Sequence, residues 1–127
     1  MNDYPIGTAT TRDWIVEEAL TVRAHGTVDL PVLATPHLIF MLEDTCVFAA
    51  IPLLSDGELT VGTAVHIDHL AATRIGEQVR VHVELVSVRG KRLVFRVEAR
   101  SGKTTVARGI HERAVVNKAE FETRLSA

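Results

Sequence analysis

Four segments in the second half of the chain alternate apolar and polar side chains with a period of two, and this pattern most restricts the possible folds. They cover residues 61–69, 79–85, 93–99 and 106–116. The sequences VRGK and RSGK are typical of hairpin turns, and AATRIG links the first two segments. Connections this short join antiparallel neighbours. The pattern therefore predicts a four-stranded antiparallel meander.

A single long helix is predicted before these strands, over the sequence TPHLIFMLEDTCVFAA. Thr35 is of the type that caps a helix N-terminus. Pro36 suits the first helical position because its missing N–H would be unpaired there in any case. Pro52 stops the helix, which we expect to end near Ile51.

The order of these elements predicts an α+β fold in which an antiparallel sheet wraps the helix. We also expect a strand at residues 11–22, followed by a loop at 23–34 that contains a glycine and a proline. One helix cannot cover both faces of about five strands, so the sheet must curl around it. The apolar surface that remains then meets a second subunit. We therefore predict one domain, residues 1–127, that forms a homodimer or a higher homo-oligomer.

Composition excludes several classes of function. The 127 residues carry a net charge of −2, without a basic patch for nucleic acid. The one cysteine, Cys46, cannot form an internal disulfide, which fits a reducing compartment. The first ten residues do not resemble a signal peptide, and Glu43 and Asp44 interrupt the longest apolar run, which argues against a membrane span. We therefore expect a cytoplasmic protein. The sequence shows no metal-ligand spacing and no phosphate-binding loop, so we expect no cofactor.

Glu43 is the most unusual residue of the predicted helix. Its helical neighbours Ile39, Cys46 and Ala50 place it within an apolar stripe. A buried carboxylate without a partner is costly, so Glu43 needs a partner or a raised pKa. Either it is a structural residue that caps a loop or pairs across an interface, or it faces a pocket as a reactive group. Asp44 lies on another side of the helix, where we expect solvent or an interface.

The predicted strands carry further candidates. His69 falls on the apolar face of its strand, as either a satisfied core residue or a functional one. Gly62 indicates either a bulge or the close approach of a ligand. His111 and Arg113 share a face of the last strand, where the arginine is either an anion clamp or part of an exposed ion pair. Cys46 has no base beside it in the sequence, so packing explains it.

Four parts of the sequence together resemble the hot-dog-fold thioesterases, and in particular the fluoroacetyl-CoA thioesterase-like family. They are Thr35, the helix FMLEDTCVFAA, the strand GTAVHIDHLAAT and the sequence HERAVV near the end. The resemblance covers most of the chain. It implies a hot-dog fold, a homodimer with sites near the interface, and an acyl-CoA substrate. It also implies catalytic roles for Thr35, Glu43 and His69, and substrate binding by the Gly62 backbone and Arg113.

Thioester hydrolysis needs a nucleophile, a proton carrier and donors to the oxyanion. On this interpretation Glu43 either attacks the carbonyl to form an anhydride or activates water, and His69 carries the proton. Thr35 bonds Glu43 or orients the carbonyl, and the Gly62 N–H donates to the oxyanion. A hot-dog enoyl-CoA hydratase and a non-catalytic acyl-CoA binding protein are the alternatives.

The acyl group is expected to be short. The family's fluoroacetyl-selective member closes its pocket with phenylalanines in the segment before the helix, whereas residues 23–34 contain none. Aliphatic side chains reject near-isosteres less sharply than an aromatic lid does. We therefore expect weak discrimination between fluoroacetyl-CoA and acetyl-CoA.

Overall fold

The computed structural model describes residues 5–126; residues 1–4 and 127 of the predicted domain lie outside this range. In chain order the elements are β1 (Ala9–Ile15), the short 3₁₀ helices η1 (Glu18–Leu20) and η2 (Arg23–His25), α1 (Thr35–Ala50), η3 (Ile51–Leu53), β2 (Glu58–His69), β3 (Gln78–Arg89), β4 (Arg92–Ser101), β5 (Thr104–Asn117) and α2 (Lys118–Ser126).

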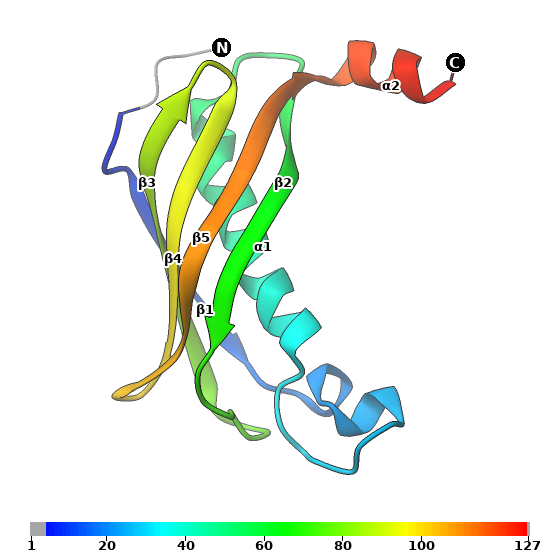
Figure 1. Cartoon of the computed structure of the whole chain (residues 1–127), viewed down its shortest axis with the longest axis vertical. Helices are drawn as coiled ribbons and strands as arrows, with labels where there is room; N and C mark the ends of the chain where they lie inside the picture. The colour runs from blue at the N-terminus through cyan, green and yellow to red at the C-terminus, as the bar shows by residue number, and fades with distance from the viewer. Residues whose placement is uncertain (1–4, 127) are drawn as a thin grey trace.

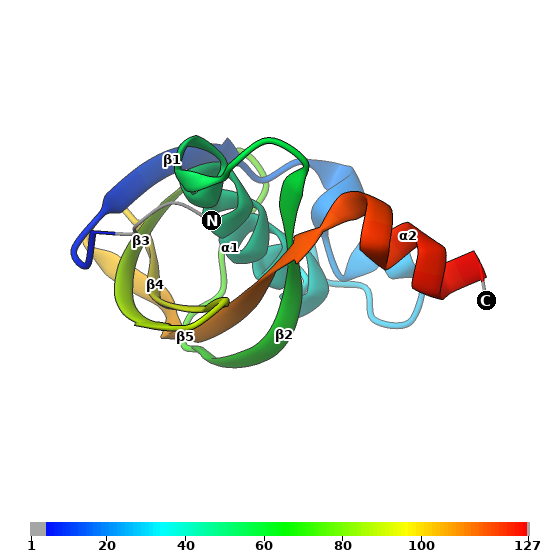
Figure 2. The same ribbon diagram turned by 90° about the horizontal axis from the view of Figure 1, so that it is seen from above.

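The five strands form one antiparallel sheet that curls around α1 (Figures 1 and 2). The strand order is β1-β3-β4-β5-β2, which leaves β1 and β2 as the edges. The predicted α+β fold, one long helix wrapped by five antiparallel strands, is confirmed. The meander is confirmed for β3, β4 and β5 but is wrong for β2, which pairs with β5. The connection at residues 70–77 carries the chain from the edge strand β2 to β3, which pairs with β1 on one side and β4 on the other.

The core lies between α1 and the concave face of the sheet. Alternate residues of the central strands are buried there, as the period-two pattern predicts: Val79, Val81, Val83 and Leu85 in β3, and Leu93, Phe95, Val97 and Ala99 in β4. α1 contributes seven buried residues. By length and composition alone, Thr35–Leu53 would suffice to cross a membrane, but here the sheet wraps this helix (Figure 2).

The segment after β1 differs from the expected strand at residues 11–22. The strand begins at Ala9 and ends at Ile15, and the chain then turns through η1 and η2. Local bonds stabilise this turn: the Thr21 hydroxyl donates to the Glu18 carbonyl at 2.7 Å, and the Arg23 guanidinium donates to the Glu18 carboxylate at 2.9 Å. These local contacts replace the strand pairing that the sequence pattern predicted.

The start of α1 also differs from the prediction. Ala34 is the N-cap residue, and no side chain caps the helix there. Thr35 is already the first helical residue, so the predicted capping role of Thr35 is wrong. Its hydroxyl bonds a residue of β2 instead. The helix ends at Ala50, and Pro52 lies in η3 directly after it.

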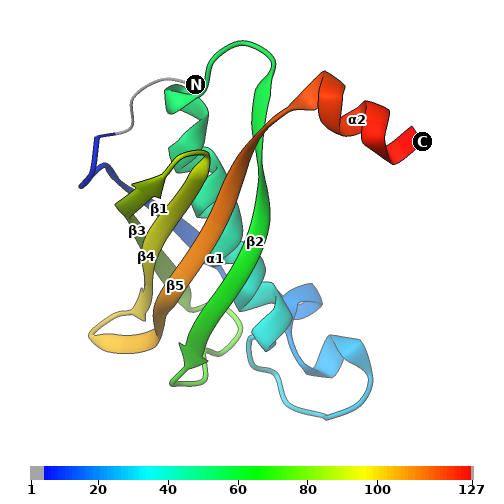
Figure 3. The ribbon, with the colours of Figure 1, turned by 45° about the horizontal axis from the view of Figure 1, so that its top comes forward.

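The C-terminal helix α2 is absent from the sequence-based prediction. The side-chain oxygen of Asn117 accepts a hydrogen bond from the Glu120 N–H at 3.0 Å and so caps the helix. The sequence does contain a signal for this helix: a capping residue, Asn117, is followed three positions later by a glutamate, Glu120. The helix projects from the sheet at the end opposite the N-terminus of α1 (Figures 1 and 3), and none of its residues is buried.

Candidate active site

Thr35 and His69 meet where α1 begins and β2 ends, at the lower end of the sheet in Figure 3. Thr35 Oγ1 and His69 Nδ1 are hydrogen bonded at 2.8 Å. The Thr35 hydroxyl can make this bond because it does not cap the helix. His69 Nε2 is buried and has no hydrogen-bond partner among residues 5–126. The Thr35 contact occupies Nδ1, so Nε2 is the ring nitrogen left for proton transfer.

An apolar hollow of about 310 Å³ adjoins this pair. Beside Thr35 and His69 it is lined by Val22, Val32, Leu33, Leu70, Ala71 and Ala72. One wall is the segment before α1, which is held by hydrogen bonds from the Val22 N–H to the Val32 carbonyl (2.9 Å) and from the Leu33 N–H to the Thr73 carbonyl (2.8 Å). The walls are aliphatic, as expected from a segment without phenylalanine.

Glu43 lies farther along α1 and faces β2 and β5. Its Oε2 accepts a hydrogen bond from Nη1 of Arg113 at 3.4 Å. A Cβ atom on Gly62 would lie 2.6 Å from the same oxygen, so the carboxylate has room only because residue 62 is glycine. The Glu43 side chain is 39% exposed. The apolar helix thus carries a half-buried carboxylate with one face open, and its partner is an arginine.

Arg113 is the more deeply buried member of this pair, with 5% of its side chain exposed. Nε donates to the Thr60 hydroxyl at 2.8 Å, and Nη2 donates to the Thr60 carbonyl at 2.9 Å. The register of the sheet places Arg113 opposite Gly62, which explains why both meet Glu43. Burial lowers the pKa of Arg113, whereas the charge of Glu43 raises it. Of the two interpretations of the arginine, the exposed ion pair is therefore wrong.

His111 completes this buried group. Its Nδ1 is 2.8 Å from the Ala64 carbonyl, and its Nε2 is 3.1 Å from Arg113 Nη1 and 4.0 Å from Glu43 Oε2. Neither His111 nor Thr60 was among the predicted site residues. The signal was available in part, because each lies two residues from a predicted site residue on the same strand.

Two other helix residues have structural contacts. Asp44 pairs with Arg12 of β1 at 2.9 Å. Cys46 is a free, fully buried cysteine, and burial raises the pKa of its thiol to about 12. Arg113 lowers this pKa only in part. Cys46 is therefore a packing residue, as the sequence indicated.

The predicted site residues form two separate groups within one chain. Thr35 and Glu43 are eight residues apart, which corresponds to about 12 Å along the helix axis. Among the described residues, no hydrogen bond or ion pair joins Glu43 to Thr35 or His69. One chain therefore brings Thr35 to His69, and Glu43 to Gly62 and Arg113. Of the two roles expected for Thr35, to bond Glu43 or to orient the carbonyl, the bond to Glu43 is not formed in a single chain.

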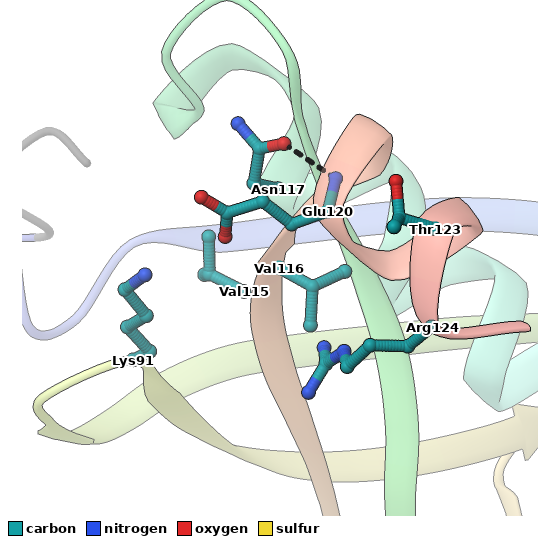
Figure 4. A pocket seen from close by; sticks show the side chains of 7 residues that line it. All are labelled: Lys91, Val115, Val116, Asn117, Glu120, Thr123 and Arg124. Carbon is teal, nitrogen blue, oxygen red and sulfur yellow. Dashed lines mark hydrogen bonds between the residues drawn. The ribbon is translucent and has the colours of Figure 1, made fainter. Parts of the chain in front are cut away.

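A larger hollow, of about 580 Å³, lies at the other end of the sheet beside α2 (Figure 4). It is lined by Lys91, Val115, Val116, Asn117, Glu120, Thr123 and Arg124. None of these is a predicted site residue, and the hydrogen bond drawn in Figure 4 is the cap of α2. We therefore place the candidate active site at the two groups described above.

The sequence profile of the family described as fluoroacetyl-CoA-specific thioesterase matches residues 16–119. The chain belongs to this family. The fluoroacetyl-CoA thioesterase of Streptantibioticus cattleyicolor is 38% identical over an alignment that covers 94% of this chain and 91% of that protein.

Solved structures agree with membership of the fluoroacetyl-CoA-specific thioesterase family. A structure of the fluoroacetyl-CoA thioesterase FlK superposes with a TM-score of 0.90 and 36% identity over 98% of this chain and 97% of that one. A hot-dog-like protein from Thermanaerovibrio acidaminovorans superposes with a TM-score of 0.89 and 25% identity over 96% and 90% of the two chains. The predicted hot-dog fold and the predicted class, a thioester hydrolase, are therefore confirmed.

Proposed function

We propose that this protein hydrolyses a short-chain acyl-CoA thioester to the carboxylate and CoA. Its family consists of thioester hydrolases. The observation that carries the proposal is the half-buried Glu43 carboxylate, which Arg113 holds against the glycine at position 62 with one face exposed. A carboxylate kept in place beside a backbone without a side chain can approach a thioester carbonyl closely.

In the proposed reaction, an oxygen of Glu43 attacks the carbonyl carbon of the thioester, and the C–S bond breaks. The CoA thiolate takes a proton from His69. Water then attacks the resulting anhydride, the bond between the acyl group and Glu43 breaks to restore the carboxylate, and the proton from water returns to His69. In the direct route, Glu43 instead takes a proton from water as the water oxygen attacks the same carbon. Both routes need the charged Glu43, and in both the Gly62 N–H donates to the oxyanion.

Arg113 and Thr35 have supporting roles in this proposal. Arg113 has five N–H donors, and four of them face the Thr60, Glu43 and His111 acceptors. One N–H on Nη2 is left for a substrate oxygen. Thr35 fixes the ring of His69 through Nδ1 and so keeps Nε2 directed to the reacting atoms.

We further propose that the complete site forms between two copies of the chain in a homodimer. Thr35 and His69 of one subunit would face Glu43, Gly62 and Arg113 of the other. The separation of the two groups within one chain supports this arrangement, because Glu43 lies about 12 Å along the helix axis from Thr35, the residue that bonds His69.

Mixing two inactive variants tests this arrangement. The variants His69→Ala and Glu43→Gln are each expected to be inactive as homodimers. After subunit exchange, a heterodimer would contain one intact site, so random mixing should restore about a quarter of wild-type activity. If both groups acted within one chain, mixing would restore nothing. Light scattering that gives a monomeric mass would contradict the dimer directly.

An acyl-CoA panel separates the proposed hydrolysis from the alternatives. Release of free CoA thiol identifies a thioesterase. Loss of the enoyl chromophore without thiol release would identify a hydratase, and saturable binding without either would identify a binding protein. The panel should run from acetyl to hexanoyl thioesters, because aliphatic side chains line the hollow beside His69.

We also propose a cytoplasmic location. The single cysteine, Cys46, is a free and buried thiol, which suits a reducing compartment. Fractionation of the source cells, with detection of this chain by antibody, would test the location.

A further inference from the structure

His111 is a buried histidine whose two ring nitrogens both have partners. Its side chain is 2% exposed. It lies on β5 opposite Val65 of β2 and Phe95 of β4, so no charged residue pairs with it across the strands. A buried polar ring that is fully bonded has a fixed orientation and a fixed protonation pattern.

The two partners define the tautomer of His111. The Ala64 carbonyl can only accept, so Nδ1 must carry the proton that it donates at 2.8 Å. The guanidinium of Arg113 can only donate, so Nε2 must be the unprotonated acceptor of the contact at 3.1 Å. Both contacts are satisfied only by a neutral imidazole with its proton on Nδ1.

This ring connects two parts of the proposed site. Ala64 follows the irregularity of β2 between Gly62 and Ala64, beside the backbone that faces Glu43. Arg113 Nη1, which donates to His111, also donates to Glu43. The Thr60 oxygens hold Nε and Nη2 of Arg113, and His111 holds Nη1, which is the nitrogen that also donates to Glu43.

We propose that His111 is a positioning residue for thioester hydrolysis: as a neutral acceptor it fixes Arg113 against Glu43. The inference rests on the proposed function and adds a residue to it. His111 does not touch the reacting atoms. Protonation of His111 would remove the acceptor and place a second positive charge beside Arg113, which would turn the guanidinium away from its present position.

The charges around His111 set the direction of its pH dependence. Burial lowers the pKa of His111, the hydrogen bond to Ala64 raises it, and the neighbouring charge of Arg113 lowers it. Glu43 on α1 and Glu112 on β5 oppose this with smaller effects. The ring is therefore neutral around neutral pH, and its contribution to activity should be lost as the pH drops through this lowered pKa.

Two substitutions separate positioning from plain packing. His111→Gln keeps an acceptor within reach of Arg113 but cannot titrate, whereas His111→Leu fills the space without an acceptor. His66→Gln is the matched control, because His66 is an exposed histidine of β2 outside the site. Each variant is compared by thermal unfolding and by kcat, KM and the pH profile of kcat/KM for the best acyl-CoA.

We expect His111→Leu to fold and to lose about tenfold to hundredfold in kcat with little change in KM, as for a small displacement of a catalytic group. His111→Gln should keep most of the activity, and its acid limb should move or flatten relative to wild type. His66→Gln should match wild type throughout. A folded His111→Leu with wild-type kcat would overturn the inference. If that variant does not fold, an acid limb in His111→Gln identical to that of wild type would overturn it.

Nitrogen NMR of the imidazoles in the full-length protein tests the same inference independently of activity. We expect His111 to show a protonated Nδ1 and an unprotonated Nε2, and to stay neutral at a lower pH than a histidine with an ordinary pKa does. A proton on Nε2, or a charged ring at neutral pH, would overturn the inference even if hydrolysis is observed. A wild-type protein that hydrolyses none of the thioesters would instead refute the proposed function.

Discussion

Substitution of Gly62 by alanine tests whether the position of the Glu43 carboxylate controls the rate. The added Cβ would lie 2.6 Å from Glu43 Oε2, whereas ordinary contact begins at 3.4 Å, so the carboxylate must move by about 0.8 Å. A misplacement of about 1 Å can reduce catalysis about a hundredfold. Because the side chain is half-exposed and flexible, it can move without displacing the backbone. We therefore expect Gly62→Ala to lose about a hundredfold in kcat while its thermal unfolding changes little.

Gly109 provides the matched control for this substitution. A Cβ there would clash with the His66 carbonyl oxygen and would lie 2.7 Å from the Ile67 Cα, and both are backbone atoms of the neighbouring strand. Gly109→Ala should therefore destabilise the sheet by about 1–3 kcal/mol or more. The assay is kcat and KM for an acyl-CoA, with the melting temperature of each variant. Wild-type kcat in a folded Gly62→Ala protein would refute the reasoning, because Glu43 would then tolerate displacement.

Three further outcomes follow from the same geometry. Glu43→Gln keeps the shape of the side chain but removes its charge, so kcat should fall by about 10²–10⁴-fold while the protein stays folded; turnover near the wild-type value would exclude the carboxylate from the reaction. Cys46 should resist thiol reagents at mildly alkaline pH, because burial raises the pKa of its thiol to about 12. It should react rapidly once the protein is unfolded, and fast labelling of the native protein would contradict this expectation. The ratio of kcat/KM for fluoroacetyl-CoA to that for acetyl-CoA should stay below about two-hundredfold, because an aliphatic pocket wall separates substrates of similar shape only weakly. A preference of many thousandfold for fluoroacetyl-CoA would contradict this expectation.

Much of the fold could be predicted because burial of one strand face leaves a period of two in the sequence. The four strands of the second half and the long helix were found in this way. Strand order could not be found by the same argument, because the short link after His69 suggested that β2 and β3 are neighbours. In the structure β2 instead pairs with β5. Which strands pair is decided by the sheet edges that remain free when the sheet curls around α1. A local pattern of apolar and polar residues contains no information about these edges.

Thr35 shows how a local rule can assign the wrong interaction to a residue. Its type and position before an apolar run predicted an N-cap. In the structure, the hydroxyl bonds His69, which is 34 residues away in the sequence. A cap contributes about 1 kcal/mol, which is similar to the net value of a side-chain hydrogen bond. Two interactions of equal strength compete for one hydroxyl, and only the approach of β2 to the start of α1 decides between them.

The burial of Glu43 and Arg113 explains why an apolar helix carries a carboxylate. The sequence suggested that Glu43 is the buried charge that needs a partner. The structure reverses this relation, since Arg113 has 5% of its side chain exposed and Glu43 has 39%. A buried guanidinium without acceptors is costly, so Arg113 requires the Thr60 oxygens, His111 and Glu43 around it. Glu43 satisfies one donor of this buried cation with Oε2 while its side chain stays 39% exposed. The ion pair gives Glu43 a structural reason to occupy this helix, and the proposed hydrolysis would add a chemical one.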